Sequence, residues 1–260
     1  MLENYTVEEL AGELYDAQVN RSPVGPLTEK EPGITVDEAY AVQIANIRRL
    51  TGEGHVIVGK KIGLTSLVMQ QMMNVNEPDY GHLLDTMHIK DGMIPMDNLL
   101  QPKMEGEIAF ILGKDLQGPD VTPEQVLEAT EYVSAALEVV DSRVKDWKIK
   151  LPDTVADNAS SGCYVISDKR VPVSDVVLTD VEMVFYKNGE ELNRGKGSAA
   201  LGDPALCVAW LANKLWAYGV TLKKGEVVLS GALSAAVNAE RGDVFRAEMS
   251  VLGPVEGRFV

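Results

Sequence analysis

Two glutamates interrupt a run of residues that otherwise has the pattern of a buried β-strand, residues 103–112. Alternate residues of a strand point to the same side, so Glu105 and Glu107 share one face, and the other face is filled by Ile108, Phe110 and Leu112. Like charges side by side in a half-buried strand repel each other and lose hydration unless a cation or strong donors neutralise them. A hard divalent metal is the simplest neutraliser.

A third carboxylate, Glu138, lies in a second short apolar run, residues 134–140. Three carboxylates from two strands, with water or substrate oxygens at the remaining positions, suit octahedral Mg²⁺ or Mn²⁺. A Glu-x-Glu pair alone is more often the solvated face of an amphipathic strand. The apolar setting of Glu138 favours a metal site, and we expect Glu105, Glu107 and Glu138 to be its ligands.

Charge and cysteine content limit the possible partners. The chain of 260 residues has a formal net charge of −15, so we expect neither nucleic acid nor an anionic membrane as a partner. A small anionic substrate remains compatible, because local charge can oppose the overall sign. Cys163 and Cys207 belong to no metal-binding or disulfide pattern. Without a signal sequence or an apolar run of membrane-spanning length, the chain is expected in the cytoplasm.

The order of local signals predicts an α+β fold with two parts. Capping boxes at Thr6 and Thr35 predict helices within the first ~50 residues. From about Val56, short apolar runs broken by glycine indicate a sheet-rich region. We therefore expect a helical N-terminal segment over residues 1–55 and a metal-binding catalytic domain over residues 56–260. The expected architecture is a sheet core with peripheral helices.

Further elements follow from turn and capping residues. Asn188-Gly189 after the apolar residues 181–186 predicts a hairpin, because Asn-Gly accepts the positive φ angles of a type I′ turn. Thr122-Pro123 and Asp203-Pro204 each predict the start of a helix. The segments 225–231 and 241–251 have the pattern of closely spaced strands.

Several polar segments are ambiguous from the residues alone. Lys60 and Lys61 lie between glycines in an apolar run, and one of them is expected to point inward, although a solvated pair at a strand end is the favoured interpretation. Residues 77–81 have the composition of a turn. The histidines have no metal-ligand spacing and are expected to be surface or loop residues: His55, His82 and His88.

Five segments occur in an order that resembles a known enzyme family. They are Lys61-Ile-Gly-Leu-Thr-Ser66, Pro78-Asp-Tyr-Gly81, Glu105-Gly-Glu107, Glu138-Val-Val-Asp-Ser-Arg143 and Asp153-Thr-Val-Ala-Asp-Asn-Ala-Ser160. Together they resemble the 2-hydroxypenta-2,4-dienoate hydratases, also called 2-keto-4-pentenoate hydratases, of aromatic meta-cleavage pathways. That family belongs to the fumarylacetoacetate hydrolase-like superfamily, so the resemblance implies a mixed β-roll core and a divalent metal, Mg²⁺ or Mn²⁺, held by three carboxylates.

The resemblance also implies roles for individual residues. It makes Lys61 and Asp79 the candidates for proton transfer and water positioning, and it favours hydration because related decarboxylases have an apolar residue in place of Asp79. The candidates for substrate binding are Ser160, Ser161, Thr65 and Ser66. The expected reaction adds water to a small 2-hydroxydienoate to give 4-hydroxy-2-oxopentanoate. A homo-oligomer is expected, able to associate with the decarboxylase of the pathway.

Other functions are compatible with the same residues. A 4-oxalocrotonate decarboxylase would use the same metal as an electron sink, and a hydratase of a longer 2-oxo-enedioate would share the site. A carbon–carbon bond hydrolase needs a water-activating His/Glu pair that the histidines do not obviously supply. A metal-bound module without catalytic activity would bind ligand tightly without turnover.

Overall fold

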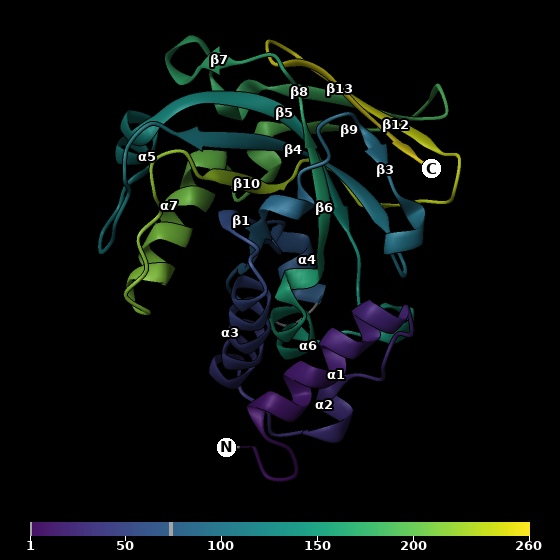
Figure 1. The fold of residues 1–260 in the computed structure, drawn as a ribbon. Helices are drawn as coiled ribbons and strands as arrows, with labels where there is room; N and C mark the ends of the chain where they lie inside the picture. Colours follow the sequence, from purple (N-terminus) through teal and green to yellow (C-terminus); the bar gives the residue numbers. More distant parts are fainter. Residues whose placement is uncertain (1, 73–74) are drawn as a thin grey trace.

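The fold, described for residues 2–72 and 75–260, comes from a computed structural model (Figure 1). The helices are α1 (Val7–Asn20), α2 (Leu27–Lys30), α3 (Val36–Gly52), α4 (Leu67–Met72), α5 (Pro123–Ala129), α6 (Leu151–Ala156) and α7 (Pro204–Trp216). The strands are β1 (Ile57–Gly63), β2 (Asp79–Leu84), β3 (Met93–Ile94), β4 (Lys103–Leu112), β5 (Thr130–Val140), β6 (Ser161–Ile166), β7 (Val171–Pro172), β8 (Glu182–Lys187), β9 (Glu190–Lys196), β10 (Val227–Ala232), β11 (Val237–Asn238), β12 (Val244–Met249) and β13 (Gly253–Phe259).

The strands form two mixed sheets. The larger sheet has eight strands, with the path β2-β1-β10-β4-β5-β6 and with β11 and β7 paired to β4 and β5. Within it β1 and β10 run parallel, and the other neighbours run antiparallel. The smaller sheet has five strands in the order β3-β13-β12-β8-β9, with only the β13–β3 pair parallel. Mixed sheets with helices around them confirm the predicted α+β class.

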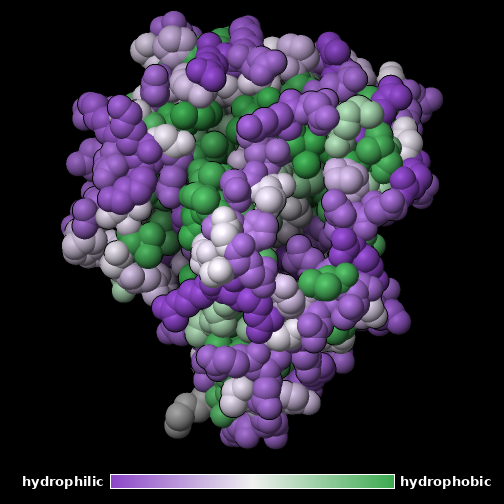
Figure 2. Space-filling model, viewed as in Figure 1, coloured by the Kyte–Doolittle hydropathy of each residue, from purple (hydrophilic) through white to green (hydrophobic). Residues whose placement is uncertain are grey.

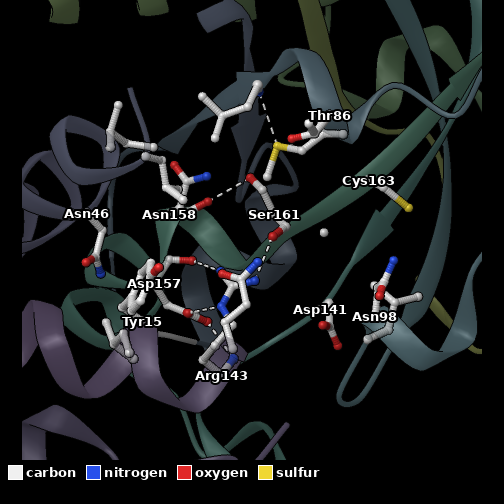
Figure 3. Close-up of a pocket in the computed structure, with 18 of the residues that line it drawn as sticks. Tyr15, Asn46, Thr86, Asn98, Asp141, Arg143, Asp157, Asn158, Ser161 and Cys163 are labelled. Atoms are coloured by element: carbon white, nitrogen blue, oxygen red, sulfur yellow. Dashed lines mark hydrogen bonds and ion pairs between the residues drawn. The ribbon is translucent and has the colours of Figure 1, made fainter. Parts of the chain in front are cut away.

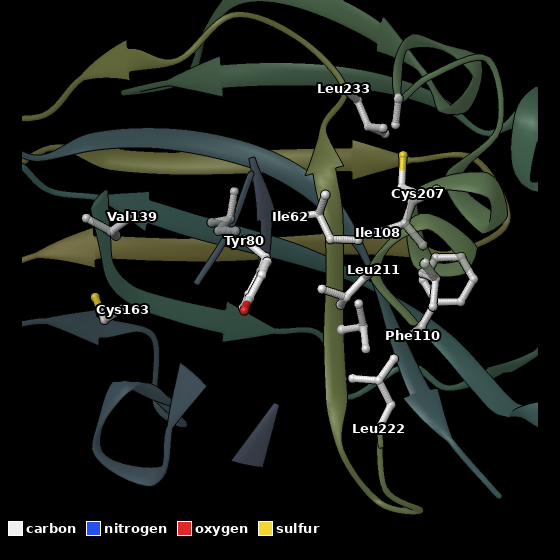
Figure 4. Packing of buried hydrophobic residues seen from close by; sticks show 14 of the residues in the cluster. Ile62, Tyr80, Ile108, Phe110, Val139, Cys163, Cys207, Leu211, Leu222 and Leu233 are labelled. Carbon is white, nitrogen blue, oxygen red and sulfur yellow. The ribbon is translucent and has the colours of Figure 1, made fainter. Parts of the chain in front are cut away.

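The two sheets pack face to face around the main core. A Cβ atom added to Gly106 of β4 would lie 2.4 Å from Sδ of Met183 on β8, so the glycine lets the sheets approach closely. The same face of β4 carries Ile108 and Phe110, which share a buried cluster with Leu211 of α7 (Figure 4). The predicted apolar face of this strand is therefore confirmed.

The larger sheet curls into a half-barrel, and its edge strands β2 and β6 come into contact. The other face of β4 and β5 lines the inside of this curve. Its middle is filled by a second, smaller apolar cluster of Leu83, Ala109, Ile111, Ala136, Tyr164 and Leu229. One end of the same face carries the glutamates that the sequence singled out, so the half-barrel places them at the rim of an apolar interior.

The local predictions are confirmed where the sequence carries capping or turn residues. Capping boxes are present at Thr6 and Thr35, and α5 and α7 begin at the predicted prolines. Asn188 and Gly189 have φ angles of 54° and 84° between β8 and β9, as the hairpin requires. The cysteines are free and buried. Residues 77–81 are not only a turn, because β2 begins at Asp79.

The N-terminal helices share the main core with the sheets. Leu10 and Leu14 of α1 belong to the same buried cluster as the strand residues. The helices end at Gly52 and β1 begins at Ile57, but the division into residues 1–55 and 56–260 stays a prediction. The view in Figure 2 is mainly hydrophilic over these helices, and hydrophobic residues gather over the sheets. Among the described residues, no helix combines the length and apolarity needed to cross a membrane.

Candidate metal and catalytic site

The three predicted glutamates converge in the structure. Glu105 on β4 and Glu138 on β5 are direct register partners, and Glu107 follows on the same face of β4. One oxygen from each of the three lies within 4.8 Å of the others. Within the described residues they are the one group of three acidic or metal-binding side chains that meets this spacing. Their convergence follows from strand pairing, because cross-strand partners present their side chains on the same face.

The surroundings of Glu105 and Glu107 disfavour the charged forms of their carboxyl groups. Burial raises the pKa of Glu105 to about 7 and the pKa of Glu107 well above its ordinary value, and the negative charge of Glu138 adds to both increases. Both oxygens of Glu138 are buried without a hydrogen bond. Glu107 accepts one, from the backbone N–H of Gly231 at 2.8 Å. Buried carboxylate oxygens without donors are what an oxygen-binding divalent cation requires, so these residues fit a metal.

Lys61 and Asp79 lie beside this cluster. The Nζ atom of Lys61 is 3.4 Å from Oε1 of Glu138. Burial alone would lower the pKa of Lys61, but the charges of Glu138 and Asp79 raise it above its ordinary value. A Cβ atom added to Gly63 would lie 2.2 Å from Oδ1 of Asp79 and 3.4 Å from Nζ of Lys61, so both groups approach the same glycine. The structure therefore brings the predicted lysine and aspartate together.

Asp79 is held on one side and left without a partner on the other. Its Oδ2 accepts a hydrogen bond from the Thr154 hydroxyl at 3.3 Å, and its buried Oδ1 accepts none. Burial raises the pKa of Asp79, and the nearby Lys61 opposes that rise. A buried carboxyl with a raised pKa and one unpartnered oxygen is suited to exchange protons with a bound molecule.

Two expectations about basic residues were wrong. The lysine pair is not solvated: Lys60 and Lys61 are 2% and 3% exposed, and Lys60 pairs with Glu226 at 3.7 Å. His82 is not a surface or loop residue, because it lies in β2, is 5% exposed, and its Nδ1 contacts Oε1 of Gln43 at 3.0 Å. Burial lowers the pKa of His82 to about 3, so this ring is neutral near pH 7.

The predicted substrate-binding residues lie at different positions around the cluster. Thr65 is buried against Gly231, the residue that holds Glu107. Ser66 precedes α4. The Ser160 hydroxyl donates to Asp157 at 3.3 Å, and the Ser161 hydroxyl donates to the carbonyl of Asn158 at 2.7 Å. Their roles toward substrate stay predictions.

Sequence reasoning gave no role to two residues that support this site. Gly231 has a φ angle of 105°, which favours glycine, and its N–H fixes Glu107. Thr154 of α6 holds Asp79. The available signals were a glycine at the end of an apolar strand and a polar segment between two apolar ones.

A cavity of about 300 Å³ lies next to this region, between the N-terminal helices and β6 (Figure 3). Its wall includes Tyr15, Asn46, Arg143, Asp157 and Ser161. None of the three glutamates lines it. The charged cluster, rather than this cavity, therefore marks the candidate site of chemistry.

Comparisons with known proteins show the family to which the chain belongs. Residues 63–260 match the family described as fumarylacetoacetate (FAA) hydrolase C-terminal. The chain is 44% identical to a 2-hydroxyhexa-2,4-dienoate hydratase from Comamonas testosteroni, over 100% of this chain and 99% of the relative. It is 45% identical to a 2-keto-4-pentenoate hydratase from Paraburkholderia xenovorans, over 97% of this chain and 94% of the relative.

A solved structure has the same fold over nearly the whole chain. It is a 4-oxalocrotonate decarboxylase from Pseudomonas putida G7, complexed with magnesium and adipate. The TM-score is 0.95 at 36% sequence identity, and the match covers 98% of this chain and 97% of the decarboxylase. Hydratases and a decarboxylase therefore share this architecture.

Proposed function

The chain belongs to the fumarylacetoacetate hydrolase C-terminal family, and we propose that it hydrates 2-hydroxypenta-2,4-dienoate to 4-hydroxy-2-oxopentanoate in aromatic meta-cleavage catabolism. It is a hydro-lyase, as are the hydratases that it resembles over its whole length. A divalent metal is its cofactor, and we propose Mg²⁺ or Mn²⁺. The observation that carries the proposal is the group formed by the half-buried Glu105 and the buried Glu107 and Glu138 beside Lys61.

The three glutamates would hold the ion. When bound there, it would supply Lewis acidity toward the carboxylate and the C2 oxygen of the substrate. The backbone N–H of Gly231 donates a hydrogen bond to Oε2 of Glu107 and would orient this side chain as a ligand. Lys61, as an ammonium ion, balances part of the negative charge of the glutamates and can hydrogen-bond an anionic substrate oxygen.

The reaction needs a proton at C5, water at C4 and a proton at C3. Protonation at C5 with loss of the C2 hydroxyl proton gives the 2-oxo-3-enoate. Conjugate addition then places the water oxygen at C4 while the water loses one proton, and protonation at C3 completes the hydration. The unpartnered Oδ1 of Asp79 can accept a proton from the attacking water. The adjacent Lys61 ammonium can return a proton to the carbon chain and stabilise the negative charge that develops on the C2 oxygen.

Product analysis tests the proposal against the alternatives. Purified protein with Mg²⁺ or Mn²⁺, with and without chelator, is supplied with 2-hydroxypenta-2,4-dienoate, its six-carbon homologue or 4-oxalocrotonate. Chelator-sensitive formation of 4-hydroxy-2-oxopentanoate without CO₂ release is the expected result. Faster turnover of the six-carbon dienoate would move the substrate toward that of the Comamonas relative. Release of CO₂ from the dicarboxylate would instead identify a decarboxylase like the structural neighbour.

We also propose that the enzyme is a homo-oligomer able to bind the decarboxylase of its pathway. Support comes from large apolar side chains on the surface, among them Leu67, Val177 and Trp216, which are 63%, 65% and 43% exposed. Light scattering coupled to size exclusion tests the first part, and a monomer at micromolar concentration would contradict it.

A further inference from the structure

Three consecutive residues close to the site adopt a left-handed backbone conformation. Asn158, Ala159 and Ser160 have φ angles of 53°, 50° and 51°. For residues with a Cβ atom this conformation costs roughly 1–2 kcal/mol each, and asparagine tolerates it best. Such conformations persist where the surrounding structure over-determines them, and they gather at functional sites.

A buried ion pair holds the turn at both ends (Figure 3). The Arg143 side chain pairs with the Asp157 carboxylate through Nε and donates through Nη2 to the carbonyl of Asp157, just before the turn. Through Nη1 it donates to the carbonyl of Ser161, just after the turn, at 2.7 Å. Asp157 also accepts hydrogen bonds from the hydroxyls of Ser142 at 3.2 Å and Ser160 at 3.3 Å. One guanidinium group thus bridges the start and the end of a strained segment.

The turn holds strand β2 through the side chain of Asn158. The Asn158 side chain accepts from the backbone N–H of His82 at 2.7 Å and donates to its carbonyl at 2.9 Å, as a neighbouring strand would. A Cβ atom on Gly81 would lie 2.3 Å from the carbonyl oxygen of Asn158, so only glycine admits the turn so closely. Gly81 is the register partner of Lys61, and Asp79 lies two residues before it on the same face.

We propose that Arg143 and Asp157 are positioning residues for hydration: through the left-handed turn of residues 158–160 they hold β2 in the place where Asp79 meets Lys61. The inference rests on the proposed function and adds to it two residues that need not touch the substrate. Helix α6, which precedes the turn, also helps to position Asp79, because its Thr154 donates a hydrogen bond to the Asp79 carboxylate. All hydrogen bonds of the two proposed side chains go to each other, to residues 142 and 160, and to backbone groups of residues 143, 157 and 161.

Arg143→Lys tests the proposal. Lysine keeps the charge opposite Asp157, but one ammonium group lacks the planar fork that reaches both carbonyls. A displacement of a catalytic group by about 1 Å can cost about 100-fold in rate, so we expect kcat to fall by about 10- to 100-fold. The affinity for Mn²⁺ should not change, because the glutamates lie on β4 and β5.

A glycine substitution in the turn distinguishes a positioning role of Arg143 from a merely structural one. Glycine adopts the left-handed conformation at little cost, so Ala159→Gly in the Arg143→Lys protein should restore much of kcat. Ala156→Gly is the matched control: both alanines are 2% exposed, but Ala156 lies in the right-handed helix α6. Ala156→Gly should not restore kcat, and it should lower the melting temperature.

Hydrogen exchange separates the fate of this inference from that of the proposed function. Peptides covering residues 157–161 should exchange faster in Arg143→Lys and regain protection with Ala159→Gly, whatever reaction the enzyme catalyses. Equal effects of the two glycine variants, loss of Mn²⁺ affinity in parallel with kcat, or an undiminished kcat in Arg143→Lys would overturn the inference. If Arg143→Lys does not fold, Ser142→Ala carries the same comparison with a smaller loss, because it removes the hydrogen bond from Ser142 to Asp157 and the one that Ser142 accepts from the Val144 N–H.

Discussion

At the scale of single residues, partners distant in the sequence decide what a charged side chain does. The pattern of apolar residues was enough to single out Glu105, Glu107 and Glu138, because a carboxylate inside a strand is unusual. The same reasoning was wrong for the lysine pair. Lys60 pairs with Glu226 and Lys61 with Glu138, and neither partner is apparent from the residues around the pair.

Glu107→Gln tests the metal site. The amide keeps the size of the side chain but loses the charge, so Mn²⁺ should bind at least about 100-fold more weakly and turnover should be lost. Titration calorimetry measures the first and product formation the second. Glu131→Gln, an exposed position on β5, is the control and should leave both unchanged. Full activity in a folded Glu107→Gln protein would contradict the assignment of Glu107 as a metal ligand.

Asp79→Asn tests proton transfer. The amide can still fill the space and accept from Thr154, but it cannot take a proton from water, so kcat should fall by about 100- to 10,000-fold. The affinity for Mn²⁺ should change little. Asp16→Asn, an exposed position on α1, is the control. A kcat near that of the unchanged protein would remove Asp79 from the mechanism.

At the scale of elements, short-range chemistry was predictable and strand pairing was not. Capping boxes and the Asn-Gly hairpin are decided within four residues, so the sequence alone places them. The extent of β2 is decided by its pairing with β1 and by the Asn158 side chain. Residues 77–81 therefore had the composition of a turn, although a strand begins at Asp79.

Gly59→Ala tests how closely β1 and β10 must approach. A Cβ atom at Gly59 would lie 2.0 Å from the carbonyl oxygen of Val227, so the alanine should lower the free energy of unfolding by about 1–3 kcal/mol. Gly12→Ala is the matched control, because nothing lies within 4 Å of its added Cβ in helix α1. That change should be stabilising by roughly 0.5–1 kcal/mol. Denaturant unfolding measures both, and equal effects would contradict the packing argument.

At the scale of the whole molecule, the acidic site lowers the stability of the metal-free fold. The general class, sheets with peripheral helices, was predictable from alternating apolar runs and capping residues. The separation into two packed sheets was not, because it depends on long-range contacts such as Gly106 against Met183. The stability of the assembled core then depends on how its buried carboxyl groups are neutralised.

Metal binding should stabilise the protein more at high pH than at low pH. The pKa of Glu105 rises from 4.5 to about 7 on folding, so the folded metal-free state binds more protons than the unfolded state in that range. The free energy of unfolding should therefore fall as pH rises from about 4.5 to about 7. Melting curves with chelator or with Mn²⁺ at pH 5.5 and pH 8 measure this. A larger rise in melting temperature at pH 5.5 than at pH 8 would contradict the burial argument.

The direct pairing of Glu105 with Glu138 has a consequence for how the chain reaches its native state. A slip of one residue between β4 and β5 would turn one strand's glutamates to the opposite face and separate the ligands. Only correctly aligned chains would then be able to hold the ion. Metal binding would therefore favour the aligned pairing of the central strands over misaligned ones during folding.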